Sequence, residues 1–253
     1  MLTLASDFGT PYPAAMKGVI LRRSDARLVD VAHDFPRQDV RAAAFWLREV
    51  LPEFPPAVHL VVVDPGVGTD RDALVVRAGD HALVGPDNGV LRPAARRLAG
   101  DDPVEPFVVR VDDPASTTFH GRDVFAPAAA DVHETGVDSL DAIDRLSPVP
   151  TEGLVDLRLP EARVTEDGAT GEVLVVDDFG NAVTNVPGDV LDGRETVEVN
   201  GECVPVGETF ASVAPGERLV TVGSHGYVEC DVNRGRGDDA FGLEAGDDVT
   251  LVG

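Results

Sequence analysis

The chain has 253 residues, enough for two domains of ordinary size, and 43% of them are hydrophobic, which excludes a disordered chain. The formal net charge is −24, from 45 acidic against 21 basic residues, and such a surface repels phosphate backbones, so the composition argues against nucleic-acid binding. No apolar run approaches the ~18 residues of a membrane span and no basic region precedes an apolar one at the N-terminus, so we expect no membrane association and a cytoplasmic protein.

The basic residues are almost all arginines, because Lys17 is the only lysine. Replacement of lysine by acids is typical of proteins kept soluble in very high salt, where screening over ~3 Å at 1 M removes self-repulsion. We therefore expect a halophilic protein, and an acidic protein from an ordinary medium is the alternative. Lys17 lies in Met16-Lys17-Gly18, outside any phosphate-loop pattern, which excludes a P-loop nucleotidase.

Cysteine and histidine, the usual ligands of zinc sites, are few in this sequence, with 2 and 6 residues. Cys203 and Cys230 form neither a zinc-type pair nor a disulfide framework, and we expect both to be small buried hydrophobic residues. No two of the 6 histidines have zinc spacing. The sequence therefore gives no support for a metal site.

The first 150 residues alternate between strand and helix patterns. The order predicts strands over 2–5, 27–32, 58–63, 73–77, 82–84 and 107–111, and helices over 13–24, 39–51, 89–98 and 124–134. This alternation is typical of an α/β sandwich with a largely parallel sheet, which we assign to residues 1–150.

The pattern changes after Ser147. Pro148, Pro150 and Pro160 punctuate a stretch without strong periodicity, and residues 151–168 read as a linker. Short strands with Gly, Asn and Asp turns follow, over 172–176, 196–199, 218–222, 227–232 and 248–252. We therefore expect a small antiparallel β-barrel domain over residues 169–253.

The most informative segment is AVHLVVVDPGVGTDR, in which a buried strand ends in Asp64 and a glycine-rich turn leads to Arg71. Ligands of open α/β sheets bind where strands end, so this carboxylate is placed for chemistry. A purely structural Asp–Arg pair on a tight turn is the alternative. His120 lies in Thr-Phe-His-Gly-Arg-Asp ahead of a helix and adds an imidazole. Together these three groups can hold and polarise a water molecule.

Other polar residues also follow strands. Asp7, after the first strand, can accept hydrogen bonds from both hydroxyls of a ribose, and a helix cap or Asx turn is the alternative. Asn88 lies in Gly-Pro-Asp-Asn-Gly, where a turn is favoured over a residue lining a cleft. In the second half, polar groups gather at 177–181 and at 223–229, and turns explain either group equally well.

In chain order these segments resemble one family, the S-adenosyl-L-methionine (SAM) hydrolases, or hydroxide adenosyltransferases, which are relatives of the fluorinases and chlorinases. The matching segments are SDFG, MKGVI, VVDPGVGTDR, GPDNGVL, TFHGRDVFAPAAA, DDFGNAVTN, GSHGYVE and VNRG. The resemblance implies an N-terminal α/β domain, a C-terminal β-barrel and a homotrimer whose active sites lie between subunits. SAM is then the substrate, and no cofactor is implied.

The resemblance also implies roles for individual residues. Asp64, Arg71 and His120 match the catalytic set of the hydrolase branch, and Asp7 matches the residue that holds the ribose. The other implied substrate-binding residues are Asn88, Asp177, Asn181, Ser224, Glu229 and Val232. The chain departs from its relatives at His225, which leaves the contribution of that position to the amino-acid pocket open.

The implied reaction is in-line displacement at C5′ by water, which gives adenosine and methionine. Asp64 and His120 are candidates to orient and deprotonate the water, and Arg71 fixes the carboxylate; the sequence does not assign the proton acceptor. The halogenases carry a tyrosine in place of Asp64 and the fluorinases a serine in place of Gly121, and a carboxylate repels halide. The alternatives are a SAM-dependent halogenase and a SAM or adenosine binding protein without turnover.

Overall fold

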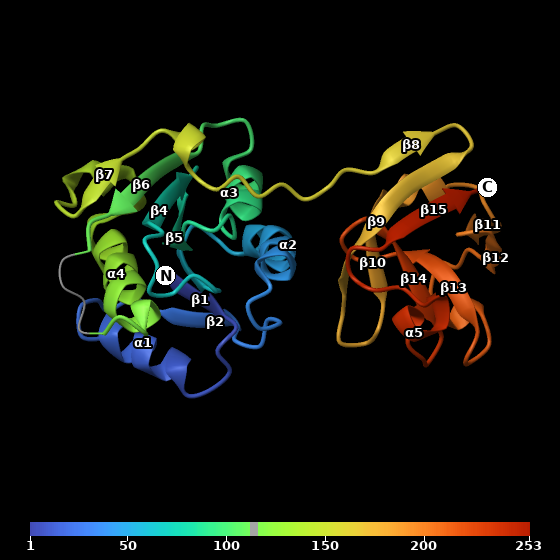
Figure 1. The fold of residues 1–253 in the computed structure, drawn as a ribbon, viewed down its shortest axis with the longest axis horizontal. Coiled ribbons are helices and arrows are strands. Elements are labelled where there is room, and N and C mark those ends of the chain that lie inside the picture. The colour runs from blue at the N-terminus through green and yellow to red at the C-terminus, as the bar shows by residue number, and fades with distance from the viewer. Residues whose placement is uncertain (112–115) are drawn as a thin grey trace. The chain divides into compact units, whose positions relative to one another are not determined.

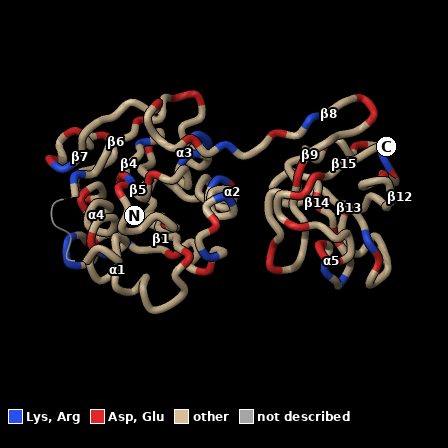
Figure 2. The backbone as a smooth tube through the Cα atoms, in the orientation of Figure 1, with Lys and Arg blue, Asp and Glu red and all other residues tan. Residues whose placement is uncertain are grey.

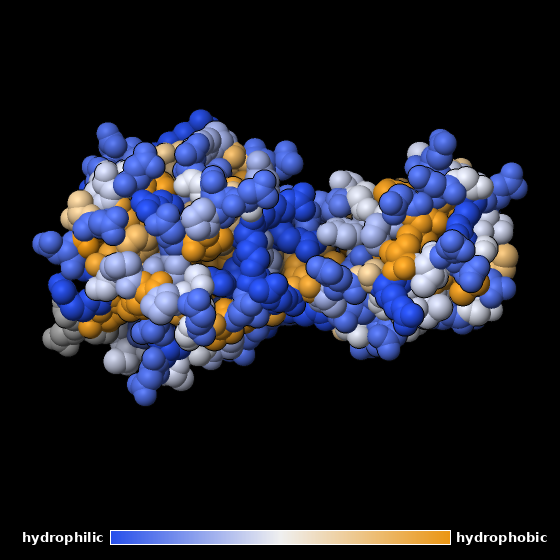
Figure 3. Space-filling model, turned by 90° about the horizontal axis from the view of Figure 1, so that it is seen from above, coloured by the Kyte–Doolittle hydropathy of each residue, from blue (hydrophilic) through white to orange (hydrophobic). Residues whose placement is uncertain are grey.

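The computed structural model describes residues 1–111 and 116–253 of the chain (Figure 1). Contacts divide them into two compact units, Met1–Arg158 and Leu159–Gly253. Acidic residues occur along the backbone of both units, and basic residues are fewer (Figure 2). On the face seen in Figure 3, hydrophilic residues surround the hydrophobic patches of each unit.

The first unit is built on one seven-stranded sheet. Its strands are β1 (Leu2–Ser6), β2 (Leu28–Ala32), β3 (Val58–Val62), β4 (Ala73–Ala78), β5 (His81–Pro86), β6 (Glu105–Val109) and β7 (Leu146–Pro148). They follow the order β2-β1-β3-β5-β4-β6-β7. The pairs β2–β1, β1–β3 and β3–β5 are parallel, and β4 and β7 run against their neighbours. Most strands therefore share one direction, and the predicted α/β class is confirmed.

Helices cover both faces of this sheet, which makes three layers. They are α1 (Tyr12–Ile20), α2 (Val40–Val50), α3 (Arg92–Ala99) and α4 (Ala126–Thr135). Figure 1 shows α1 and α4 on one side of the sheet and α2 and α3 on the other. Strand β3 is buried on both faces, because Val58 and Leu60 join the core under α1 and α4 while Val61 joins the core under α2 and α3. Its uninterrupted apolar sequence follows from this position.

Helix ends differ from the expected ones for local reasons. Helix α2 begins after Asp39, whose carboxylate accepts a hydrogen bond from the Ala42 amide at 2.8 Å. Helix α3 begins only at Arg92, and the proline that follows suits a first turn. The predicted helix over 124–134 is preceded by a π-helical turn, Gly121–Phe125, that joins it. Short 3₁₀ helices lie at Leu51–Glu53, Val137–Ala142, Thr151–Gly153, Gly188–Leu191 and Phe210–Ser212.

The second unit is an antiparallel barrel. Its elements are β8 (Arg163–Thr165), β9 (Gly168–Val176), β10 (Ala182–Pro187), β11 (Thr196–Val199), β12 (Glu202–Pro205), β13 (Arg218–Val222), β14 (Tyr227–Val232), α5 (Gly237–Phe241) and β15 (Asp248–Val252). The order is β12-β11-β15-β9-β10-β14-β13, with β8 beside β9. A bridge from Val206 to Val220 connects the two ends of this order. Strand β8 lies within the segment 151–168 that the sequence pattern presents as a linker.

The expectation that both cysteines are buried is wrong for Cys203. Cys230 lies in the barrel core, whereas Cys203 is exposed. On β12 the side chains alternate, and Val204, only 1% exposed, takes the inward position next to Cys203. Among the described residues the longest α-helix, α2, has 11 residues, so no described helix is long and apolar enough to cross a membrane.

Candidate active site

Asp64, Arg71 and His120 lie together at the C-terminal end of β3. The Arg71 guanidinium donates from Nε to Asp64 Oδ1 at 2.7 Å and from Nη2 to Asp64 Oδ2, a two-pronged pairing. The same Nη2 donates to His120 Nδ1 at 3.1 Å. Arg71 therefore connects the Asp64 carboxylate with the imidazole of His120, which lies 49 residues after Arg71 in the chain.

The Arg71 side chain is fixed on all sides. Its Nη1 donates to the Asp72 carbonyl at 3.1 Å, and its guanidinium carbon lies 5.0 Å from the centre of the buried Phe125 ring. Only 11% of the Arg71 side chain and 4% of the Asp64 side chain are exposed. A planar donor over an aromatic ring holds one orientation, so the Asp64 carboxylate is held in one orientation too.

His120 is held as a neutral imidazole with a defined tautomer. Burial and the neighbouring Arg71 charge lower the pKa of His120 below 6.5, against the smaller raising effects of Asp64 and Asp123. A guanidinium only donates hydrogen bonds, so Nδ1 of His120 must accept. The hydrogen of the neutral ring then lies on Nε2, where the imidazole acts as a donor.

The turn after β3 brings Asp64 and Arg71 close to the segment that carries His120. The Val67 amide donates to the Asp64 carbonyl at 3.3 Å, which closes the turn. Gly68 adopts a φ of 81°, and a Cβ there would lie 3.3 Å from the Thr117 carbonyl oxygen. A side chain at Gly68 would thus both strain the backbone and separate the turn from the segment that carries His120.

Asp7 lies directly after β1, and aromatic contacts connect its loop with that of His120. Asp7 Oδ2 accepts a hydrogen bond from the Gln38 amide at 2.8 Å, and the residue is 8% exposed. Phe8 and Phe119, the neighbours of Asp7 and His120 in sequence, make an edge contact with centroids 5.8 Å apart. The two loops therefore lie at the same end of the sheet as Asp64.

Asn88 uses its amide within the fold. Nδ2 donates to the Val63 carbonyl at 2.8 Å, and Oδ1 accepts from the Val90 amide at 3.1 Å. The side chain therefore ties the end of β3 to the turn before α3. These contacts are the ones expected if Asn88 is a turn residue. That Asn88 also binds substrate stays a prediction.

In the second unit, Asp177 and Asn181 form the turn between β9 and β10. Asp177 Oδ1 accepts from the backbone amides of Phe179 and Asn181 at 2.9 and 2.8 Å, and Oδ2 accepts from Asn181 Nδ2 at 3.0 Å. The carboxylate thus organises the whole turn. Phe179 at its tip is 79% exposed.

Glu229 and Val232 lie on β14, and Ser224 lies in the turn before it. Burial and the charges of Asp231 and Asp177 raise the pKa of Glu229 to about 7. Strand pairing aligns Ala182, which follows the Asp177–Asn181 turn, with Cys230 on β14. The Glu229 carboxylate packs against Gly223, which directly follows β13 and lies opposite the start of β14. Ser224 itself is exposed, and Val232 is 7% exposed.

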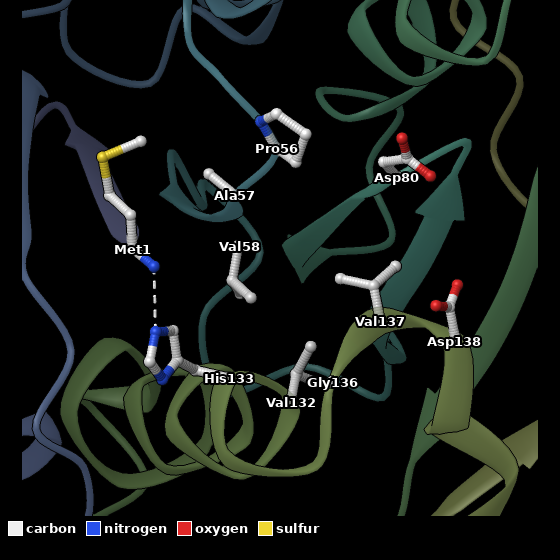
Figure 4. Close-up of a pocket in the computed structure, with 10 residues that line it drawn as sticks. All are labelled: Met1, Pro56, Ala57, Val58, Asp80, Val132, His133, Gly136, Val137 and Asp138. Atoms are coloured by element: carbon white, nitrogen blue, oxygen red, sulfur yellow. Dashed lines mark hydrogen bonds between the residues drawn. The ribbon is translucent and has the colours of Figure 1, made fainter.

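A separate cavity of about 360 Å³ lies at the N-terminal ends of the strands (Figure 4). There the amino group of Met1 contacts Nε2 of His133 at 2.9 Å. None of the predicted site residues lines this cavity, which is bounded by Met1, Pro56, Ala57, Val58, Asp80, Val132, His133, Gly136, Val137 and Asp138. Over residues 1–111 and 116–253, no cluster of three His, Cys, Asp or Glu side chains could hold a metal ion.

Comparison with known proteins identifies the family. The N-terminal domain model of the SAM hydroxide adenosyltransferases matches residues 2–143, and the C-terminal domain model matches residues 171–250. The chain belongs to this family. The resemblance expected from the sequence motifs is therefore confirmed.

Similar proteins cover nearly the whole chain. A (R)-S-adenosyl-L-methionine hydrolase of Salinispora tropica is 42% identical over 99% of this chain and 97% of its own length. One of Thermus thermophilus is 44% identical over 98% of this chain and 97% of its own. The crystal structure of an uncharacterized conserved protein from Thermotoga maritima has a TM-score of 0.86 and 32% identity, with full coverage of both chains.

Sequence reasoning missed two features of these sites. Burial of Glu229, together with the fully buried Asp231 two residues further along β14, raises the pKa of Glu229, and sequence reasoning did not single out Asp231. His33 contacts the loop of Asp7, although its sequence context is unremarkable. The only available signal was its position after a strand that neighbours β1 in the sheet.

Proposed function

We propose that this protein hydrolyses SAM to adenosine and L-methionine. The observation that supports this activity best is the hydrogen-bonded Asp64–Arg71–His120 group, in a chain whose relatives are named (R)-S-adenosyl-L-methionine hydrolase. The R epimer of the sulfonium is accordingly the proposed substrate. The reaction joins one water to the SAM cation and yields adenosine, methionine and one proton.

Water attacks C5′ of the ribose, and the C5′–S bond electrons leave with sulfur as a neutral thioether. Departure of that group needs no general acid, so the protein must position the water and accept its proton. The Asp64 carboxylate accepts a hydrogen bond from the water, and Nε2–H of neutral His120 donates one to it. The contact between Arg71 and His120 Nδ1 supports this division, because it leaves Nδ1 no lone pair for the water.

Substrate contacts come from both units. In this proposal Asp7 holds the ribose hydroxyls with its free acceptor capacity, since the Gln38 amide occupies Oδ2. Asn88 lines the same end of the sheet, and the barrel supplies Asp177, Asn181, Ser224, Glu229 and Val232. Burial disfavours ionisation of Glu229, and a cationic substrate beside it would favour the ionised form. We propose a homotrimer in which each site combines the α/β unit of one subunit with the barrel of its neighbour.

The test is the appearance of adenosine on incubation with each sulfonium epimer of SAM, followed by chromatography. Asp64→Asn and His120→Ala should each lower turnover at least ~100-fold, the lower range for acid–base groups. Near-normal rates in both variants refute the assigned roles. Formation of 5′-chloro-5′-deoxyadenosine in chloride would identify a halogenase instead. SAM binding without any product over hours would identify a binding protein.

A further inference from the structure

The loop that carries Asp7 is held at both ends by one residue, His33. Ser6 Oγ lies 2.8 Å from His33 Nδ1, and the Gly9 amide donates to the His33 carbonyl at 2.7 Å. Ser6 and Gly9 flank Asp7 and Phe8 in sequence. The direction of the Asp7 side chain therefore depends on where His33 lies.

His33 is itself fixed on its far side. Its Nε2 lies 3.0 Å from Asp30 Oδ1, and Lys17 Nζ donates to Asp30 Oδ2 at 2.6 Å. A carboxylate accepts hydrogen bonds, so His33 donates from Nε2. In the tautomer with its hydrogen on Nε2, Nδ1 of His33 accepts from the Ser6 hydroxyl. The result is a continuous chain of contacts from helix α1 through β2 to the end of β1.

The order serine, histidine, aspartate does not make a nucleophile here. Ser6 is completely buried, so its oxygen cannot meet a substrate. The imidazole, by contrast, is partly exposed, with 16% of its side chain accessible. The chain of contacts ends at the backbone of the Asp7 loop, and its effect must act through that loop.

We infer that Ser6 and His33 are positioning residues for Asp7, which set the direction in which its carboxylate meets the ribose hydroxyls of the substrate. This inference rests on the proposed function, in which Asp7 holds the ribose. One oxygen of Asp7 is already bound to the Gln38 amide, so the carboxylate cannot rotate to compensate for a displaced loop. A shift of ~1 Å at a binding group is enough to cost a large factor in binding or rate.

The chain offers a matched control on the same strand. Thr3, near the start of β1, places its hydroxyl 2.7 Å from His59 Nδ1, and both residues are buried. Thr3→Val and Ser6→Ala each remove one buried hydroxyl-to-imidazole contact from β1. Only Ser6 adjoins Asp7, so a purely structural role predicts the same outcome for both variants and a positioning role does not.

The experiment measures the affinity of the full-length protein for adenosine and for 2′,3′-dideoxyadenosine by calorimetry, and kcat and KM for SAM. Ser6→Ala should weaken adenosine binding about 10-fold and leave dideoxyadenosine binding unchanged. KM should rise similarly, with kcat within about threefold of the wild type. Ser6→Ala and Thr3→Val should lower the thermal midpoint of unfolding by similar amounts. Thr3→Val should leave the affinities for both nucleosides unchanged.

His33 variants separate the two halves of the chain of contacts. His33→Asn keeps a polar atom near the position of Nδ1 and should retain most of the adenosine affinity, whereas His33→Leu should lose as much as Ser6→Ala. Equal losses for both nucleosides, or no loss, overturn the inference.

An Asp7→Asn variant with unchanged adenosine affinity overturns the inference as well, because the ribose contact is then absent. A wild type that binds adenosine but releases none from SAM refutes the proposed function, while the nucleoside comparison still decides the role of Ser6 and His33.

Discussion

Replacing Arg71 by lysine tests how far the site depends on a planar, two-pronged donor. Arg71 makes hydrogen bonds from Nε and Nη2 to Asp64, from Nη2 to His120 and from Nη1 to the Asp72 carbonyl. A lysine ammonium is a point charge that can keep one contact to Asp64 but cannot also reach His120 in the same geometry. Hydrogen bonds to charged groups contribute roughly 1.5–3 kcal/mol each.

If two such contacts are lost in the transition state, the barrier rises by about 3 kcal/mol at the least. Since 1.36 kcal/mol is a factor of 10, Arg71→Lys should lower kcat/KM by at least ~100-fold. The assay is adenosine formation from SAM. Arg77→Lys is the control, because Arg77 likewise lies over an aromatic ring, Phe107, and pairs with a carboxylate, Glu105, away from the site.

The pH profile provides a second readout of the same residue. Burial and the Arg71 charge both lower the pKa of His120, so its imidazole is protonated only at a lower pH than that of an unperturbed histidine. Arg71→Gln removes one of these causes, and the acid limb of kcat/KM should move to higher pH. The reasoning is refuted if Arg71→Lys retains more than a third of wild-type activity, or if the acid limb of Arg71→Gln stays in place.

Three further predictions concern stability. The pKa of Glu229 is raised to about 7, so its ionisation destabilises the folded state increasingly from pH 4.5 to about 7 and fully above that. Glu229→Gln should therefore raise the urea midpoint of unfolding at pH 8 but not at pH 4.5. The same variant should weaken SAM binding. Burial lowers the pKa of His59 to about 3, so below pH 6.5 this histidine binds a proton in the unfolded chain but not in the folded one. The free energy of unfolding should therefore fall by about 2 kcal/mol at pH 5. His59→Gln should not show this loss in the same unfolding assay. With a net charge of −24, the thermal midpoint should rise from dilute buffer to molar KCl; an unchanged midpoint contradicts the halophilic interpretation.

The fold was predictable where burial determines the pattern. The uninterrupted apolar run of β3 identifies a strand covered on both faces, and the periodicity over 39–51 identifies α2, whereas the capping role of Asp39 emerged only from the structure. Strand β10 was not foreseen, because polar and apolar residues alternate no more clearly along it than along the turns on either side. Cys203 shows the same limit, since residue type predicts burial on average and strand register decides it at each position.

The candidate site was predictable only over short distances. Asp64 and Arg71 are seven residues apart across a glycine turn, so their pairing follows from local geometry. The contact between Arg71 and His120 depends on how two distant segments pack, which periodicity does not encode. The raised pKa of Glu229 depends on its burial and on the charges of Asp231 and Asp177, and the proximity of Asp177 follows from the pairing of β9, β10 and β14.

The scarcity of lysine has a practical consequence for work with this protein. Apart from the terminal amine, amine-directed reagents meet a single side chain, and Lys17 is the residue that holds Asp30 against His33. Acylation or coupling to a sensor surface there would neutralise the ammonium and loosen the support of the Asp7 loop. Attachment through the exposed thiol of Cys203, on a strand of the other unit, leaves that support untouched.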